Sequence, residues 1–309
     1  MTLTIGPGWA VGAGFSVTSR STINGFTTPA TMNGSTTLAQ MFAVTVNSSG
    51  LFVAVGRDSV NAPVYATSAN GSTWTTPARM NGSAVVAQML GVTVNSSGLF
   101  VAVGYDTSSV GVYATSANGS TWTTPARFNG SAVACGFTGV TVNSSGLFVA
   151  VGYNFTPTLI PYYSTSANGS TWTTPAAING TSVASPIQDI TVNSEGIFVA
   201  VGYLLSGGQC YATSANGSTW TTPAAMPGST TGQTTAVSAS SNGLFVAVGY
   251  SANVPKYSTS TDGSTWTTPA TMGTSTDCLI QGVAVNSAGL FTAVGYINST
   301  FYPAYATST

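Results

Sequence analysis

One unit of about 48 residues repeats along the whole chain, and this repeat limits the folds that the protein can adopt. The segment NGSTWTTPA recurs with its tryptophan at positions 74, 122, 172 and 220, and as DGSTWTTPA at position 266. A degraded copy, NGFTTPA, begins at Asn24. GLFVAVG and YATS or YSTS recur at similar spacings, with small variations. Tandem units of this length build solenoids or closed arrays. No break in composition marks a second domain, so we expect one domain over residues 1–309.

Each unit is expected to contain four short strands. In one repeat these are TGVTVN, LFVAVGY, YYSTS and STWTTPA, with a proline at the end of the fourth, where no ladder donor is needed. In LFVAVG, Leu147, Val149 and Val151 share one face, while Phe148 and Ala150 share the other. Both faces are apolar, which is typical of a strand covered on both sides. Asn-Gly and Ser-Gly steps between the strands favour tight hairpins.

Four-stranded units repeated around six times close best as a β-propeller, so we expect an all-β fold with a single propeller. A linear solenoid would need polar caps, whereas both ends here resemble partial repeats. The first partial repeat has strand-like segments at 3–5, 9–12 and 16–19. Val17 and Phe26 are nine residues apart, as are Tyr65 and Trp74, which favours about seven blades. The alternative has six blades, with residues 26–30 completing the last one and residues 1–20 left as an appendage.

The run STDGSTW, residues 260–266, and its asparagine versions resemble the Asp-box, or bacterial neuraminidase repeat, S/T-x-D/N-x-G-x-T-W. The resemblance implies a turn between the third and fourth strands of each blade, capped by the acid or amide, with the tryptophan wedged into the blade. Here Asn or Asp is followed directly by Gly, which fits a structural turn and argues against metal binding. The matching residues are Asn70, Trp74, Asn118, Trp122, Asn168, Trp172, Asn216, Trp220, Asp262 and Trp266.

Composition excludes several classes of function. Only 5 Lys and Arg residues occur in 309, too few for a basic nucleic-acid footprint. The absence of His removes Ser-His-Asp and Cys-His catalysis and most zinc sites. No acid cluster recurs at ligand spacing, so we expect neither a metal nor a cofactor. No apolar run suggests membrane insertion, and the N-terminus has no recognisable signal peptide. The three cysteines are expected to be buried thiols.

Recognition is expected on one face of the propeller. The turns NSSG and ANGS hardly vary and would share a face, whereas the connections between strands two and three and between units vary strongly. Eight of the eleven charged residues, Asp189 among them, fall in or beside these variable connections. Variable loops on a rigid scaffold usually carry recognition. Tyrosines that follow GLFVAVG are expected to pack against neighbouring blades. The candidate recognition residues are Arg57, Asp58, Asp106, Phe155, Tyr162, Lys256, Phe301 and Tyr302.

We expect a protein that acts by contact and is not an enzyme. The sialidases that carry the Asp-box need an arginine cluster, a tyrosine with a glutamate partner and an aspartate. The one glutamate here, Glu195, falls in an invariant turn, away from Asp189 and Asp106. Fucose-binding propeller lectins typically use an Arg, a Glu and a Trp in each pocket, a trio that this chain lacks.

The low charge, the surface rich in Thr, Ser and Asn, and the near-identical repeats resemble proteins on the outside of bacteriophage particles. A virion surface or appendage protein is therefore the first functional hypothesis. The alternative is a glycan-binding propeller that is secreted or lies on a cell surface, and an intracellular scaffold is third. The expected partners are other structural proteins or surface glycans, and assembly into a homo-oligomer or lattice is compatible with the low net charge.

Overall fold

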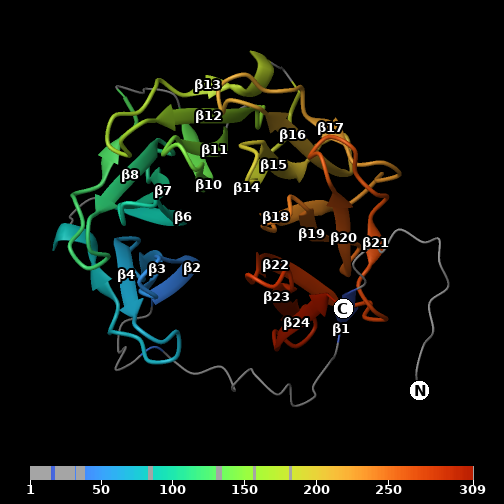
Figure 1. Ribbon diagram of the computed structural model, residues 1–309, viewed down its shortest axis with the longest axis horizontal. Helices are drawn as coiled ribbons and strands as arrows, with labels where there is room; N and C mark the ends of the chain where they lie inside the picture. Colours follow the sequence, from blue (N-terminus) through green and yellow to red (C-terminus); the bar gives the residue numbers. More distant parts are fainter. Residues whose placement is uncertain are drawn as a thin grey trace.

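The computed structural model describes residues 15–17, 32, 39–82, 86–129, 134–155, 158–180 and 183–308. These residues form six four-stranded antiparallel sheets arranged in a ring, which is a six-bladed β-propeller (Figure 1). We call each sheet a blade and number the blades in chain order from residue 39. None of the helical segments in these ranges has the length and hydropathy of a membrane span.

The four strands of each blade lie side by side, in order from the centre of the ring to its rim. The innermost strands are β2 (Ala39–Val46), β6 (Ala87–Val94), β10 (Cys135–Val142), β14 (Ile187–Val192), β18 (Gln233–Ala239) and β22 (Cys278–Val285). The second strands are β3 (Phe52–Asp58), β7 (Phe100–Asp106), β11 (Phe148–Asn154), β15 (Phe198–Tyr203), β19 (Phe245–Ser251) and β23 (Phe291–Ile297). The third strands are β4 (Pro63–Ser68), β8 (Gly111–Ser116), β12 (Pro161–Ser166), β16 (Gln209–Ser214), β20 (Val254–Ser260) and β24 (Pro303–Ser308). The outer strands are β5 (Ala78–Arg79), β9 (Ala126–Arg127), β13 (Ala176–Ala177), β17 (Ala224–Ala225), β21 (Ala270–Thr271) and, in blade 6, β1 (Phe15–Val17).

Blade 6 joins the two ends of the chain. β1 pairs antiparallel with β24, with Phe15 opposite Ser308 and Val17 opposite Ala306. The preference for seven blades is therefore wrong, and the six blades of the alternative are confirmed. Its assignment of residues 1–20 to an appendage is wrong, because β1 lies among them. The strand that completes the last blade is β1, whereas residues 26–30, 3–5 and 9–12 lie outside the described residues. The nine-residue spacing between Val17 and Phe26 is a local feature, so it does not show which strand the first segment pairs with. That pairing depends on a contact with the other end of the chain.

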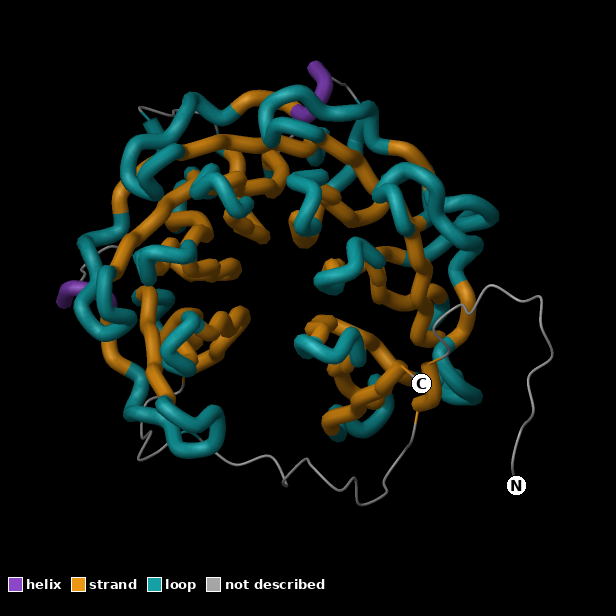
Figure 2. The backbone as a smooth tube through the Cα atoms, in the orientation of Figure 1, coloured by secondary structure: helices purple, strands orange, loops and turns teal. Residues whose placement is uncertain are grey.

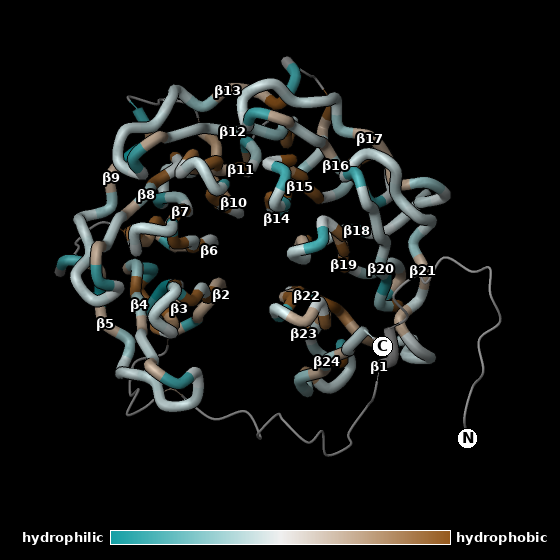
Figure 3. The backbone as a smooth tube through the Cα atoms, viewed as in Figure 1, coloured by the Kyte–Doolittle hydropathy of each residue, from teal (hydrophilic) through white to brown (hydrophobic). Residues whose placement is uncertain are grey.

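The hydrophobic cores lie between neighbouring blades. Val149 and Val151 on β11 pack against blade 4, while Phe148 and Ala150 pack against blade 2, and all four side chains are fully buried. The alternation predicted for LFVAVG is thus confirmed, because each second strand supplies one apolar face to each neighbour. Figure 3 shows hydrophobic residues concentrated on the strands inside the blades and more polar residues along the outer loops.

The outer strands are shorter than expected and begin after the proline. In blade 1, the Thr75 N–H donates to the Thr67 carbonyl oxygen at 2.9 Å, and the Thr67 N–H donates to Thr75 Oγ1 at 2.9 Å. A hydroxyl therefore takes the place of a ladder carbonyl before the two-residue strand Ala78–Arg79 begins. Two short 3₁₀ turns, η1 (Met80–Gly82) and η2 (Ile178–Gly180), follow outer strands.

The described strands leave a gap between blades 1 and 6 (Figure 2). Val44 and Val46 on β2 are 58% and 46% exposed, whereas Val92, at the place of Val44 in blade 2, is 9% exposed. On blade 6, Val294 is 45% exposed, whereas its counterpart Val248 in blade 5 is fully buried. Within the described ranges, core clusters join each blade to the next from blade 1 to blade 6, and none joins blade 6 to blade 1.

The two faces of the propeller differ as expected. Successive strands run antiparallel, so the short turns share one face and the variable connections share the other. On the variable face, the loop between strands two and three lies beside the connection between blades. The Ala87 N–H donates to the Asn61 carbonyl oxygen at 2.7 Å, and the Asn298 N–H donates to that of Asp277 at 3.2 Å. We call this surface the variable-loop face.

Candidate functional site

A ring of six half-buried side chains surrounds the central opening on the variable-loop face. Each member follows the glycine of GLFVAVG, and we call the set the mouth ring. Its members are Arg57, Tyr105, Tyr153, Tyr203, Tyr250 and Tyr296. Burial raises the pKa of Tyr153, and the nearby hydroxyls of Tyr203 and Tyr105 raise it further. Tyr105, Tyr153 and Tyr203 therefore lie close to one another. Tyr105 lies against Gly136 of the next blade, and Tyr153 is hydrogen-bonded to Gln188 of the next blade.

Two loop phenylalanines extend the mouth ring outward. The Phe155 ring lies between Tyr105 and Tyr153, with centroid distances of 4.6 and 5.2 Å. The Phe301 ring stacks on Tyr296 with a centroid distance of 5.8 Å. Phe301 is 75% exposed and the adjacent Tyr302 is 67% exposed. Phe301 also has a backbone φ of 57°, in the left-handed region that disfavours bulky residues.

Arg57 is the single cationic member of the mouth ring. Gln40 Oε1 accepts hydrogen bonds from Arg57 Nε at 3.1 Å and Nη2 at 3.0 Å. Asn61 Oδ1 accepts a third, from Nη1, at 2.9 Å. The guanidinium carbon lies 5.7 Å from the centre of the Phe42 ring, a cation–π contact. Neutral groups therefore fix the orientation of this cation.

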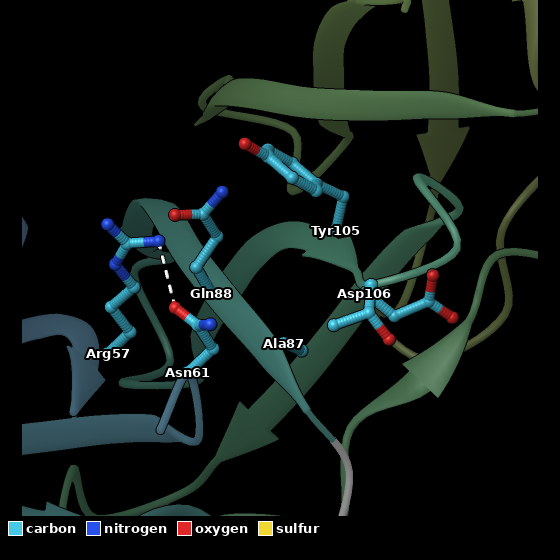
Figure 4. Close-up of a pocket in the computed structure, with 7 residues that line it drawn as sticks. Arg57, Asn61, Ala87, Gln88, Tyr105 and Asp106 are labelled. Atoms are coloured by element: carbon cyan, nitrogen blue, oxygen red, sulfur yellow. Dashed lines mark hydrogen bonds between the residues drawn. The ribbon is translucent and has the colours of Figure 1, made fainter. Parts of the chain in front are cut away.

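A small cleft opens beside Arg57 where blades 1 and 2 meet. Its volume is about 140 Å³. The residues that supply its side-chain functional groups are Arg57, Asn61, Gln88, Tyr105, Asp106 and Thr107. Figure 4 shows the Gln88 amide between the guanidinium of Arg57 and the ring of Tyr105. The cleft thus presents a cation, two amides, an aromatic ring and a hydroxyl, together with the carboxylate of Asp106, which is paired with Arg127.

The carboxylates of Asp58 and Asp106 accept hydrogen bonds from the loops that follow them and stabilise those loops. Asp106 Oδ1 accepts the N–H groups of Ser108 at 2.8 Å and Val110 at 3.0 Å, while Oδ2 lies 2.6 Å from Arg127 Nη2. Asp58 makes the equivalent contacts in blade 1, with Arg79 at 2.7 Å. Although burial opposes ionisation of Asp58, the hydrogen bonds it accepts lower its pKa. This geometry argues against a direct recognition role for the two predicted aspartates.

Tyr162 and Lys256 lie away from the mouth ring. Tyr162 packs against the hydrophobic core between blades 2 and 3. Lys256, on the third strand of blade 5, donates from Nζ to Thr271 Oγ1 on the outer strand at 2.9 Å. Of the eight predicted recognition residues, Arg57, Phe155, Phe301 and Tyr302 are those placed at or beside the mouth ring.

A larger cavity occupies the central channel and extends into the gap between blades 1 and 6. Its volume is about 980 Å³, and its walls include Phe42, Leu90, Thr138, Gln188 and Gln281 from the innermost strands. Apolar residues predominate in the lining from blades 1 and 2, whereas blades 3 to 6 contribute both polar and apolar residues. Arg57 over Phe42, and a hydrogen bond between Tyr153 and Gln188, connect the mouth ring to it.

Asp189 also lines this channel, so the prediction that it belongs with the variable connections is wrong. It lies on β14, the innermost strand of blade 4, where other repeats carry Gly or Ala. Its Oδ1 accepts the Ile190 N–H at 2.8 Å, and its Oδ2 accepts the Val237 N–H of blade 5 at 3.0 Å. Burial raises the pKa of Asp189 to about 6, against the opposing effect of these two hydrogen bonds.

The Asp-box segments form the turns between the third and fourth strands. Asn168 Oδ1 accepts the N–H groups of Ser170 at 3.0 Å and Thr171 at 2.8 Å, and Trp172 Nε1 donates to the Gly169 carbonyl oxygen at 3.0 Å. The same amide and indole contacts recur in the other four boxes, at Asn70 with Trp74, Asn118 with Trp122, Asn216 with Trp220, and Asp262 with Trp266.

The box tryptophans pack between blades. Trp172 contacts Val101 and Val103 of blade 2 as well as Phe148 of its own blade. A tyrosine of the preceding blade secures the turn, since Tyr113 Oη donates to the Ser170 carbonyl oxygen at 2.5 Å. Trp74 is only half-buried because its face of blade 1 borders the gap between blades 1 and 6.

The acids of the described chain are dispersed. Glu195 lies in the turn between β14 and β15, on the face opposite the variable loops. No group of three or more Cys, Asp and Glu residues gathers in the described ranges in a way that could hold a metal ion.

Three amides were not predicted from the sequence: Asn61 and Gln88, which line the cleft, and Gln40, which binds Arg57. Gln40 and Gln88 occupy the same place in successive repeats, 48 residues apart, directly beside the mouth-ring positions. That shared place is the signal that could have drawn attention to them.

Comparison with known proteins supports the architecture. No protein-family model and no curated protein matches this sequence. A protein of unknown function from Dyadobacter fermentans is similar in structure, with a TM-score of 0.63 and 14% identity over 90% of this chain and 95% of that chain. The BP39L lectin from Burkholderia pseudomallei has a TM-score of 0.58 and 12% identity over 81% and 78% of the two chains. The NanB sialidase from Streptococcus pneumoniae has a TM-score of 0.62 and 10% identity over 90% and 70%. At these identities the likeness establishes the β-propeller fold alone.

Proposed function

We propose that this protein is a non-catalytic binding propeller that recognises a glycan through its variable-loop face. The observation that carries the proposal is the exposed aromatic pair Phe301 and Tyr302 beside the mouth ring. A bulky residue in the left-handed region costs about 1–3 kcal/mol. Because the Phe301 side chain is 75% exposed, burial recovers little of that cost. Folding alone therefore does not account for a phenylalanine here, whereas recognition does.

The chemistry of the mouth suits a sugar. Aromatic rings offer flat apolar surface, and binding sites combine such surface with a few oriented polar groups. Tyr105, Tyr153 and Phe155 form one aromatic cluster, and Gln88 and Asn61 lie beside it in the cleft. The BP39L lectin shares the propeller fold, which makes a glycan ligand compatible with this architecture.

The non-catalytic part of the proposal is supported by where the acids lie. Asp58 and Asp106 are each paired with an arginine, and Asp189 accepts two backbone N–H groups. Asp262 and Glu195 belong to short turns. Glycoside hydrolysis needs two carboxyl groups that flank one bond. Release of reducing sugar or sialic acid by the purified protein would contradict this part.

For its setting, we propose the surface of a bacteriophage particle, with a secreted or cell-surface position as the alternative. Support comes from composition, with 4% charged residues and a net charge of −1, which reduces repulsion between closely packed copies. Mass photometry of the purified protein tests this setting. Ordered oligomers or attachment to larger particles are expected, and a strictly monomeric protein that joins no particle would count against it.

A glycan-array screen tests the binding proposal. We expect specific binding by the native protein that is lost in Phe301→Ala and Tyr302→Ala. Leu290→Ala is the matched control, because Leu290 is also exposed, at 42%, and lies beside a short turn on the opposite face. Binding that survives both aromatic substitutions would refute the assignment to this face. An array without any specific glycan would refute glycan recognition and favour a purely structural role.

A further inference from the structure

The cleft beside Arg57 has a feature that general glycan recognition does not explain. At the place of Arg57, the five other blades carry tyrosine. The guanidinium donates three hydrogen bonds, to Gln40 and Asn61, which fix its orientation. Both acceptors are neutral amides. A preorganised guanidinium loses less freedom when it binds, because its orientation is already set.

Arg57 also differs from the other arginines of the described chain in its charge balance. Arg79 and Arg127 are each neutralised by an aspartate at 2.7 and 2.6 Å. In the part of the chain that the structure describes, no carboxylate lies within ion-pair distance of Arg57. Asp106 borders the cleft, but its Oδ2 bonds Arg127, and Figure 4 shows its carboxylate pointing away from Arg57. The guanidinium of Arg57 therefore has no counter-ion among the described residues.

We propose that this cleft binds the carboxylate of an acidic sugar, and this inference rests on the glycan-binding function proposed above. The forked donors of a guanidinium match the two oxygens of a carboxylate. Tyr105 offers its ring to the sugar, and Gln88 offers an amide to its hydroxyl groups. The volume of about 140 Å³ limits the cleft to a single sugar unit. A ligand this small binds weakly unless several units are engaged together.

The probes are methyl β-glucuronide, methyl β-glucoside and glucose 6-sulfate, titrated into the full-length protein and followed by NMR at low salt. We expect the glucuronide to bind about tenfold more tightly than the neutral glucoside, the difference that one charge-assisted contact typically makes. The preference should shrink as salt is added, because screening weakens a partly exposed ion pair. Tighter binding of the sulfate than of the glucuronide would overturn the assignment to a carboxylate.

Two variants of Arg57 and one control complete the test. Arg57→Gln should abolish the preference for the glucuronide, and Arg57→Lys should retain part of it, because lysine keeps the charge without the fork. Lys256→Gln removes the same charge from the outer half of blade 5 and should leave the preference intact. Circular dichroism confirms that each variant is folded.

The outcomes separate the two proposals. Equal binding of the glucuronide and the glucoside, or a preference that persists in Arg57→Gln, would overturn the carboxylate site while glycan recognition stands. Failure of all three sugars to bind, together with an empty glycan array, would overturn both.

Discussion

Asp189 should make this protein less stable at neutral pH than at mildly acidic pH. Its carboxylate faces the central channel and accepts N–H groups from Ile190 and from Val237 of the next blade. Blades 1 and 5 carry alanine at the equivalent place, as Ala43 and Ala236. The substitution Asp189→Ala therefore introduces a residue that this position already tolerates elsewhere in the ring.

The size of the effect follows from the pKa. Burial raises the pKa of Asp189 to about 6 from an ordinary value of 3.8, a difference of about 2.2 units. At about 1.4 kcal/mol per unit, the ionised carboxylate costs the folded state up to about 3 kcal/mol above pH 6. The side chain keeps partial exposure to the channel, so this value is an upper bound. Between pH 3.8 and 6 the folded state binds more protons than the unfolded state, and stability falls as pH rises.

Few other groups titrate in that window. The chain has no histidine. The pKa values of Asp58, Asp262 and Asp277 are all lowered, so those groups lose their stabilising contribution only below about pH 4. The pH dependence between about 4.5 and 7.5 should therefore report mainly on Asp189.

The measurement is denaturant unfolding at pH 4.5 and 7.5, at constant ionic strength, for the native protein and Asp189→Ala. We expect the free energy of unfolding of the native protein to be higher at pH 4.5, by up to about 2 kcal/mol, because part of the effect is already present at pH 4.5, where the carboxyl of the unfolded chain is largely ionised. In Asp189→Ala this difference should largely disappear. Equal stability of the native protein at the two pH values, or the same pH dependence in the variant, would refute the reasoning.

Three further predictions concern the scaffold. Gly152→Ala should lower the free energy of unfolding by about 3 kcal/mol or more, because the added Cβ would lie 1.9 Å from a backbone oxygen of the neighbouring strand; a stability close to native in denaturant unfolding would contradict this. Tyr113→Phe should cost about 1 kcal/mol by removing the hydrogen bond to Ser170, as thermal unfolding would measure, with Tyr302→Phe as a neutral control. Burial raises the pKa of Cys135 and Cys210 to about 12, so at pH 8 neither thiol should react with a thiol reagent until the protein unfolds, and rapid reaction of the native protein would disprove their burial.

The repeated motif correctly predicted the structure of a single blade, because the strands of a blade and their buried faces are encoded within one repeat. The alternation in LFVAVG encodes two buried faces, and Val149 and Phe148 pack against opposite neighbours as expected. The number of blades depends on a contact between the chain ends. β1 has the spacing of a third strand, yet it pairs with β24 because blade 6 lacks an outer strand of its own. The pairing of β1 with β24 therefore cannot be predicted from the spacing of the repeats.

The site was only partly predictable for a similar reason. Phe301 and Arg57 were among the predicted recognition residues, and both lie at the mouth ring. Asp58 and Asp106 were predicted too, but each pairs with an arginine 21 residues later in the chain. That recurring separation was the available signal for a structural pair. What makes Arg57 distinctive is the lack of a counter-ion among the described residues, and this depends on neighbours that are distant in sequence.

The gap between blades 1 and 6 affects where the protein is expected to unfold locally. In the described chain, blades 2 to 5 are each flanked by two apolar cores, whereas blades 1 and 6 have one each. A row of units stabilised by nearest neighbours frays from its ends. Among the described blades, amide hydrogens are therefore expected to exchange slowest in blades 3 and 4 and fastest in blades 1 and 6, although the outline of the ring is circular.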